Sequence, residues 1–129
     1  MNILANDGID AKGQVALEAM GCTVLTEKVS QDALAGFIHS ENIDGLLVRS
    51  ATTARKELID ACPNLKFIGR GGVGIDNIDA VYAREKGVDV FNTPASSSAS
   101  VAELVMAMMF ASNRFLYQAG GAMPVNGEE

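Results

Sequence analysis

A glycine-dense loop between a short apolar strand and a helix reads Gly69-Arg70-Gly71-Gly72-Val73-Gly74-Ile75-Asp76-Asn77-Ile78-Asp79. Glycines let backbone N–H groups approach a ligand closely, and the start of the following helix adds partial positive charge, so the loop suits an anion. The letters satisfy G-x-G-x-x-G through Gly69, Gly71 and Gly74, a pattern typical of dinucleotide pyrophosphate sites. Dinucleotide binding, binding of a smaller anion and a plain tight turn all remain open on this stretch alone.

The flanking sequence alternates short apolar runs with helical patterns. Strand-like runs begin near residues 3, 23, 46, 66 and 88, and helical patterns occupy residues 10–20, 30–39, 53–61 and 78–86. Short apolar strands alternating with helices predict a parallel sheet covered on both faces. Gly21 and Gly87 follow two of the helical patterns, where a helix end favours glycine. We therefore predict an α/β fold: a flavodoxin-like, doubly wound, five-stranded parallel sheet, followed by a long apolar interface helix.

Ligands of such sheets bind at the carboxyl ends of the strands. Three loops are expected there, at residues 49–52, 69–79 and 92–98. A dinucleotide site also needs an acidic residue closing the next strand, but that strand ends Val90-Phe91-Asn92. We therefore favour a carboxylate or phosphate clamp made by Arg49 and the N–H groups of residues 71–74.

Composition narrows the function classes. The chain has 129 residues, is 48% hydrophobic and carries a net charge of −6, while residues 49–70 hold five of the ten basic residues and only two acidic ones. A small cationic region in an acidic protein favours a small anionic ligand over nucleic acid or membrane. The first residues contain no basic leader, and Cys22 and Cys62 have no metal-ligand spacing. We expect a cytoplasmic protein with reduced thiols and no metal site.

The last segment has a different character. Ser100 and Glu103 have capping-box spacing, which predicts a helix starting there, and from residue 101 to 111 every residue except Glu103 is apolar. A helix that is apolar all round must be buried all round, so we expect an interface. The predicted organisation is a domain at residues 1–99, the interface helix at residues 100–118 and a hinge or frayed end at residues 119–129.

Four ordered blocks resemble the substrate-binding half of the D-isomer-specific 2-hydroxyacid dehydrogenase family, and among its branches the D-3-phosphoglycerate dehydrogenases. They are Val48-Arg49-Ser50-Ala51-Thr52, residues 67–79, Gly87-Val88-Asp89-Val90-Phe91-Asn92-Thr93-Pro94 and Ser100-Val101-Ala102-Glu103-Leu104. The resemblance implies a D-2-hydroxy acid as substrate, with 3-phosphoglycerate, an intermediate of serine biosynthesis, as the first candidate.

The resemblance also implies site residues. Arg49 and Ser50 would contact the anionic end of the substrate, and the backbone N–H groups of Gly72, Val73 and Gly74 would bind its carboxylate. Val73 would also lie near the nicotinamide of NAD. A further implied substrate contact is Ser97, where many members of the family have asparagine. The helix from Ser100 would pack against the cofactor domain and a partner in a homodimer.

The same resemblance places the NAD-binding domain and the catalytic residues after residue 129, so we expect no catalytic residue among these 129 and no activity from them alone. His39, the only histidine, lies in a predicted helix away from the strand ends and is expected to be structural. The alternative is a stand-alone, flavodoxin-like module that binds or senses a small anion. A receiver domain is disfavoured because the third strand ends in Arg49 rather than aspartate.

Overall fold

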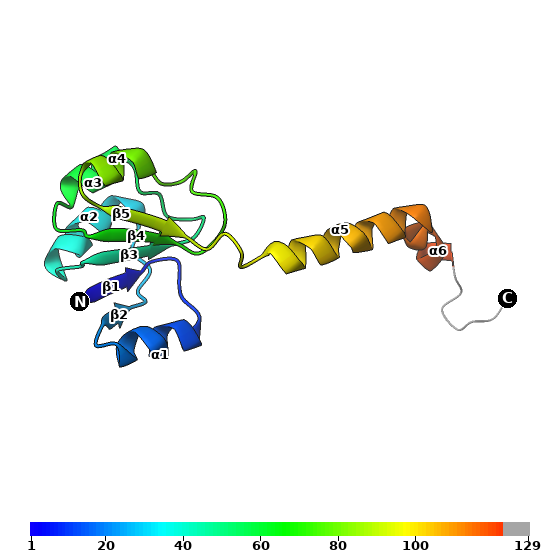
Figure 1. The fold of residues 1–129 in the computed structure, drawn as a ribbon, viewed down its shortest axis with the longest axis horizontal. Coiled ribbons are helices and arrows are strands. Elements are labelled where there is room, and N and C mark those ends of the chain that lie inside the picture. Colours follow the sequence, from blue (N-terminus) through cyan, green and yellow to red (C-terminus); the bar gives the residue numbers. More distant parts are fainter. Residues whose placement is uncertain (123–129) are drawn as a thin grey trace. The chain divides into compact units, whose positions relative to one another are not determined.

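The computed structural model describes residues 1–122, which form two units. The first unit runs from Met1 to Pro94 and the second begins at Ala95 (Figure 1). The three predicted ligand loops, at residues 49–52, 69–79 and 92–98, all begin in the first unit.

The first unit is built on a five-stranded sheet (Figure 1), with strands β1 (Asn2–Ala5), β2 (Thr23–Leu25), β3 (Gly45–Val48), β4 (Phe67–Arg70) and β5 (Asp89–Asn92). All neighbouring strands are parallel, in the order β2-β1-β3-β4-β5. This is the flavodoxin-like order, and the prediction of a five-stranded parallel sheet is confirmed. The carboxyl ends of β3, β4 and β5 are adjacent, so the loops that follow them meet at one edge.

Four helices connect the strands: α1 (Ala11–Ala19), α2 (Gln31–Ser40), α3 (Lys56–Ala61) and α4 (Ala80–Glu85). The last three share one apolar core with the sheet, to which β1, β3 and β4 contribute Leu4, Leu46 and Ile68. Ile3 points to the opposite face, because side chains alternate along a strand, and it is only 1% exposed. Helix α1, which contacts β2, belongs to that second face.

Two aromatic side chains, one from β4 and one from β5, form part of the second face of the sheet. The rings of Phe67 and Phe91 are 5.6 Å apart, and Phe67 lies over Gly45, where an added Cβ would meet the ring at 2.0 Å. Phe91 lies over Gly69 in the same way and is 51% exposed. Glycine at both positions leaves the space that the rings occupy next to the backbone of the sheet.

The helix boundaries follow the predicted pattern with one local difference. Gly21 and Gly87 follow α1 and α4 with φ of +83° and +82°, as expected for glycine after a helix end. Helices α3 and α4 begin two or three residues later than predicted, because Ala54 and Ile78 form an isolated parallel bridge. This bridge ties the chain after β3 to the chain after the glycine loop.

The second unit contains α5 (Ser98–Asn113) and α6 (Leu116–Ala122). The prediction that Ser100 caps this helix was wrong, because the N-cap residue is Ser97 and no side chain caps the helix. The helix also ends earlier than residue 118, and Phe115 between α5 and α6 has φ of +51°. Of the predicted hinge, Gly120 and Gly121 lie in α6, while residues 123–129 lie outside the described residues.

Helix α5 carries large apolar side chains around its circumference. Seven large apolar side chains are each about half exposed or more, and Glu103 is the only charged residue in the helix. They are Val101, Leu104, Val105, Met106, Met108, Met109 and Phe110. None of the helices within residues 1–122 has the length and apolar character that crossing a membrane requires.

Candidate functional site

Two of the predicted loops lie against each other at the carboxyl edge of the sheet. The loop after β3 begins with Arg49, and the glycine loop begins where β4 ends at Arg70. The N–H of Gly71 donates to the carbonyl of Val48 at 2.9 Å, which extends the pairing of the two strands into the loops. The sequence argument that joined Arg49 to the glycine loop is therefore consistent with their geometry.

Arg49 presents an unpaired cation at this edge. Its side chain is exposed, and its guanidinium has no hydrogen-bond or ion-pair partner within residues 1–122. Its Cγ lies 3.6 Å from the position that a Cβ on Gly71 would occupy, so the side chain passes beside the glycine loop. Ser50 follows it and is also exposed.

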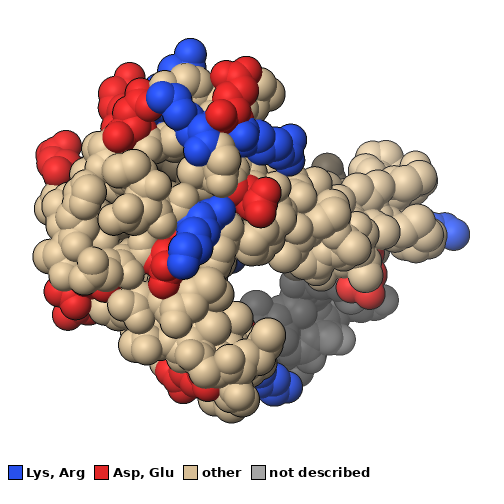
Figure 2. All heavy atoms as spheres, turned by 60° about the vertical axis from the view of Figure 1, so that its left-hand side comes forward, with Lys and Arg blue, Asp and Glu red and all other residues tan. Residues whose placement is uncertain are grey.

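The other basic residues of the cationic region are engaged elsewhere. Arg55 pairs with Asp79 at 3.0 Å, and Lys66 pairs with Asp44 at 2.7 Å. Lys56 lies over the ring of Tyr82, 5.1 Å from the centroid, and Arg70 bonds the glycine loop. On the face shown in Figure 2, basic and acidic side chains are intermingled. Of the five basic residues, Arg49 is the one left available for an anion.

Arg70 is a structural part of the loop. Its Nε donates to the carbonyl of Arg49 at 3.3 Å, and its Nη1 donates to the carbonyl of Gly74. An added Cβ at Gly72 would lie 2.9 Å from Nη1, and one at Gly74 would lie 3.4 Å from it. Glycine at these two positions therefore leaves room for the Arg70 side chain to cross the loop.

The predicted backbone donors differ in their availability. The N–H of Gly72 donates to the Thr93 hydroxyl at 2.9 Å, and the carbonyl of Gly72 accepts from the N–H of Thr93 at 3.1 Å. The N–H groups of Val73 and Gly74 have no acceptor among the residues that the structure describes. Val73 is 51% exposed. Two adjacent free amides and one free guanidinium, on loops that are hydrogen-bonded to each other, can bind a carboxylate and a second anionic group.

Asp7, which follows β1, is a site residue that the sequence analysis missed. With Lys28, Arg49 and Ser50 it lines a hollow of about 390 Å³. Its side chain is only 4% exposed and forms an ion pair with Lys28. Burial raises the pKa of Asp7, but hydrogen bonds from Lys28, Arg49 and Thr52 outweigh burial and hold the pKa well below its usual range. A signal was present, since Asn6 and Asp7 directly follow the first strand and so share its carboxyl edge.

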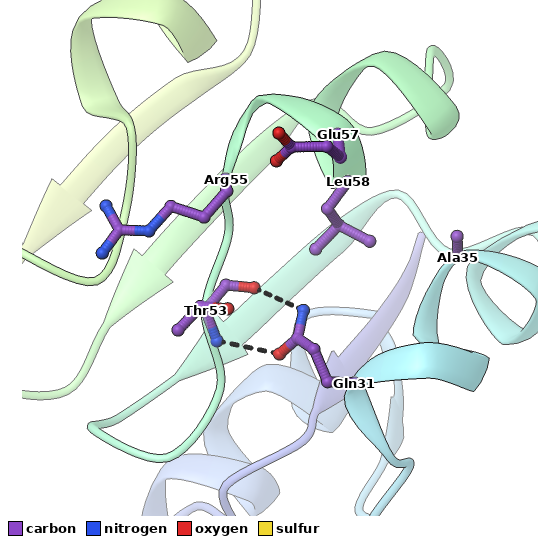
Figure 3. A pocket seen from close by; sticks show the side chains of 6 residues that line it. All are labelled: Gln31, Ala35, Thr53, Arg55, Glu57 and Leu58. Carbon is purple, nitrogen blue, oxygen red and sulfur yellow. Dashed lines mark hydrogen bonds between the residues drawn. The ribbon is translucent and has the colours of Figure 1, made fainter.

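A second hollow, between α2 and the start of α3, is occupied by internal contacts (Figure 3). The Gln31 side-chain amide donates to the carbonyl of Thr53 at 2.9 Å and accepts from its N–H at 3.1 Å. The Arg55 side chain points away from Gln31 in this view. These contacts use the polar groups of the hollow to fix α2 against the loop, so we assign it a structural role.

The remaining predicted residues have simple positions. Ser97 lies in the second unit, at the start of α5. His39 contacts the carbonyl of Ala61 through Nε2, which fits the structural role expected of it. Burial raises the pKa of the Cys62 thiol, which disfavours a reactive thiolate. Residues 1–122 contain no group of acidic, histidine and cysteine side chains that could hold a metal ion.

Comparison with known families identifies the family of this chain. The sequence model of the D-isomer specific 2-hydroxyacid dehydrogenase family, catalytic domain, matches residues 3–122. A hydroxypyruvate reductase of Thermotoga maritima is 42% identical over 115 residues, which are 88% of this chain and 37% of that protein. A D-3-phosphoglycerate dehydrogenase of Methanocaldococcus jannaschii is 38% identical over 123 residues, which are 95% of this chain and 23% of that protein.

The fold comparison agrees. The crystal structure of 3-phosphoglycerate dehydrogenase from Entamoeba histolytica with bound NAD+ has a TM-score of 0.70 and 28% identity, over 86% of this chain and 38% of that one. The chain thus spans 37% and 23% of the lengths of these two curated relatives.

Proposed function

The chain belongs to the D-isomer-specific 2-hydroxyacid dehydrogenase family, and from this premise we propose that it is the substrate-binding part of an NAD-dependent oxidoreductase acting on a D-2-hydroxy acid. The observation that carries the proposal is a free Arg49 guanidinium and free N–H groups at Val73 and Gly74, on two loops joined by the Gly71–Val48 hydrogen bond. These groups can bind and orient an acid. Hydride transfer also needs a nicotinamide held against the substrate carbon.

Each group of the proposed site would bind a different part of the substrate. The amides of Val73 and Gly74 would hold the carboxylate next to the reacting carbon, with Gly72 joining them if its N–H leaves the Thr93 hydroxyl. Arg49 and Ser50 would hold an anionic group at the other end of the substrate. Ser97 would add a hydroxyl contact, and Val73 would face the nicotinamide. We propose that NAD itself is bound mainly by residues outside this chain, and that residues 1–129 alone do not catalyse the reaction.

A substrate with two anionic ends fits two separate anion-binding groups, so 3-phosphoglycerate is our first candidate, with a role in serine biosynthesis. The D-3-phosphoglycerate dehydrogenase relative supports this choice. The 42% identical hydroxypyruvate reductase supports a smaller acid without phosphate as the second candidate. Steady-state reduction of NAD+ by the complete enzyme with D-3-phosphoglycerate and with D-glycerate separates the two by their kcat/KM.

Arg49→Ala tests the assignment of the site in that enzyme. Loss of one charge-assisted hydrogen-bonding partner costs about 1.5–3 kcal/mol, so KM for the acid should rise roughly 10- to 100-fold. KM for NAD+ should stay within about twofold, because Arg49 does not contact the dinucleotide in this proposal. An unchanged KM for the acid in Arg49→Ala would contradict the assignment of Arg49. If the complete protein binds the acid but does not transfer hydride, the alternative function, a small-anion-binding module, would be favoured.

A further inference from the structure

One carboxylate holds both ends of the loop that carries Arg49. The Oδ2 atom of Asp7 accepts from the N–H of Arg49 at 2.8 Å and from the N–H of Thr52 at 3.0 Å. Its Oδ1 accepts from the Thr52 hydroxyl at 2.7 Å and from Lys28. With a side chain only 4% exposed, Asp7 is a fixed anchor that follows β1 and lies outside the loop it holds.

One amide holds the carbonyl groups of the same two residues. The Nδ2 of Asn77, which follows the glycine loop, donates to the carbonyl of Arg49 at 2.8 Å and to that of Thr52 at 2.7 Å. Asn77 is 7% exposed, and two carbonyl acceptors fix its orientation, since a flipped amide would place Oδ1 against both oxygens. Arg49 and Thr52 are thus held at both N–H and C=O by side chains from outside the loop.

The anchors stop short of the loop's tip. Ser50 and Ala51, the two residues between the held positions, are exposed. The hydroxyl of Thr52 also accepts from Asn6 at 2.8 Å, which adds a second contact from the end of β1. The backbone from which the Arg49 side chain extends is therefore fixed, while the guanidinium itself has no partner within the described residues.

We propose that Asp7 and Asn77 are positioning residues that act on the substrate through Arg49. This inference rests on the function proposed above. Anchoring the backbone of Arg49 before the substrate arrives lowers the ordering cost of binding, because less conformational freedom is lost when the guanidinium meets the anion. Asp7 and Asn77 themselves need not touch the substrate. Their effect should appear in binding of the acid and should depend on the presence of Arg49.

A double-mutant cycle between Asp7→Ala and Arg49→Ala in the complete enzyme tests this dependence. We expect Asp7→Ala to raise KM for D-3-phosphoglycerate about 10-fold when Arg49 is present and by less than about twofold when Arg49 is already alanine. In both backgrounds kcat and KM for NAD+ should stay within about twofold of the parent enzyme. A general loss of stability would not distinguish the two backgrounds.

Asp44→Ala is the matched control. Asp44 also accepts from one backbone N–H, that of Asn2 at 2.8 Å, and from one lysine, Lys66, but it lies at the opposite end of the strands. The KM of the Asp44→Ala enzyme for the acid should equal that of the parent enzyme. If Asp7→Ala does not fold, Asp7→Asn replaces it in the cycle, because asparagine keeps one acceptor for the two amides, and a smaller rise in KM with the same dependence on Arg49 is expected.

The outcomes separate the two proposals. If Arg49→Ala leaves KM for the acid unchanged, the substrate site itself is wrong. If Arg49→Ala raises KM but Asp7→Ala raises it equally in both backgrounds, or not at all, the site stands and the positioning role is overturned. Asn77→Asp gives an independent reading, since its carboxylate would face two carbonyl oxygens and should raise KM for the acid only when Arg49 is present.

Discussion

At the scale of single residues, the site depends on which polar groups remain free. Asp7, Asn77 and Arg70 hold loops through side-chain hydrogen bonds, whereas the guanidinium of Arg49 and the N–H groups of Val73 and Gly74 are unpaired within residues 1–122. The occupied groups are backbone anchors, and the free groups are the ligand contacts that we propose. This separation means that substitutions of the two kinds should have different signatures, in stability or in binding.

The Asp7 carboxylate should make stability depend on pH. Its pKa is held below the usual range in the folded chain, whereas the unfolded chain binds the proton near pH 4, so its contribution is present above that pH and is lost as pH falls further. We predict that the difference in free energy of unfolding between the parent chain and Asp7→Asn is constant from about pH 7 to pH 5 and shrinks below about pH 4. Urea unfolding at pH 7, 5 and 3 measures it. A difference that persists undiminished at pH 3 would contradict the prediction.

The residues with free polar groups could be predicted from the sequence, whereas the residues that anchor the loops could not. Arg49, Val73 and Gly74 follow strands in recognisable blocks, so their position at the ligand edge could be predicted. A lone aspartate after a strand, such as Asp7, is equally typical of an ordinary turn. Its role depends on β1 and β3 being neighbours, which is a property of strand order and not of local sequence.

At the scale of elements, the helical and strand periods were sufficient to predict the sheet, but the boundaries were not. Four serines lie between residues 96 and 100, and each could cap a helix. The S-x-x-E spacing singled out Ser100, whereas α5 starts at Ser98. The late starts of α3 and α4 come from the bridge between Ala54 and Ile78, a long-range contact that no local pattern encodes.

Gly45 gives a stability test of the sheet. Gly45→Ala would place a Cβ 2.0 Å from the Phe67 ring, so the ring must leave its position on the backbone. Overpacking of this kind costs about 1–3 kcal/mol, and we expect a loss of that size in urea unfolding.

Gly36→Ala is the matched control for this substitution. Gly36 lies in α2 with nothing within 4 Å of an added Cβ, and alanine there should stabilise the chain by roughly 0.5–1 kcal/mol. Equal effects of the two substitutions, in either direction, would show that Phe67 does not pack on Gly45 as described.

At the scale of the whole molecule, the first unit has its own core and the second unit exposes apolar side chains all around α5. Because exposed apolar surface of this kind is unfavourable in water, we propose a homodimer formed through α5. The molar mass of the parent chain, measured by sedimentation, should be about twice its 13.5 kDa monomer mass. Leu104→Glu combined with Met108→Glu should shift it to the monomer, because both charges would be buried in the contact.

Val15→Glu provides the comparison for this measurement. Val15 is 65% exposed on α1, outside the second unit, and its substitution should leave the dimer intact. A parent chain that sediments as a monomer at high micromolar concentration would show that α5 is not a contact between copies.

We propose that this chain holds the acid at the carboxyl edge of its sheet. Titration of the 15N-labelled chain with D-3-phosphoglycerate, followed at its backbone amides by NMR, measures this binding. We predict the largest chemical-shift changes at Ser50, Val73 and Gly74. In the Arg49→Ala chain these changes should be lost, most of all at Ser50. Lys66 and Lys86, at the opposite edge, should not respond. Shifts confined to that opposite edge, or no response at Val73 and Gly74 at millimolar acid, would contradict it.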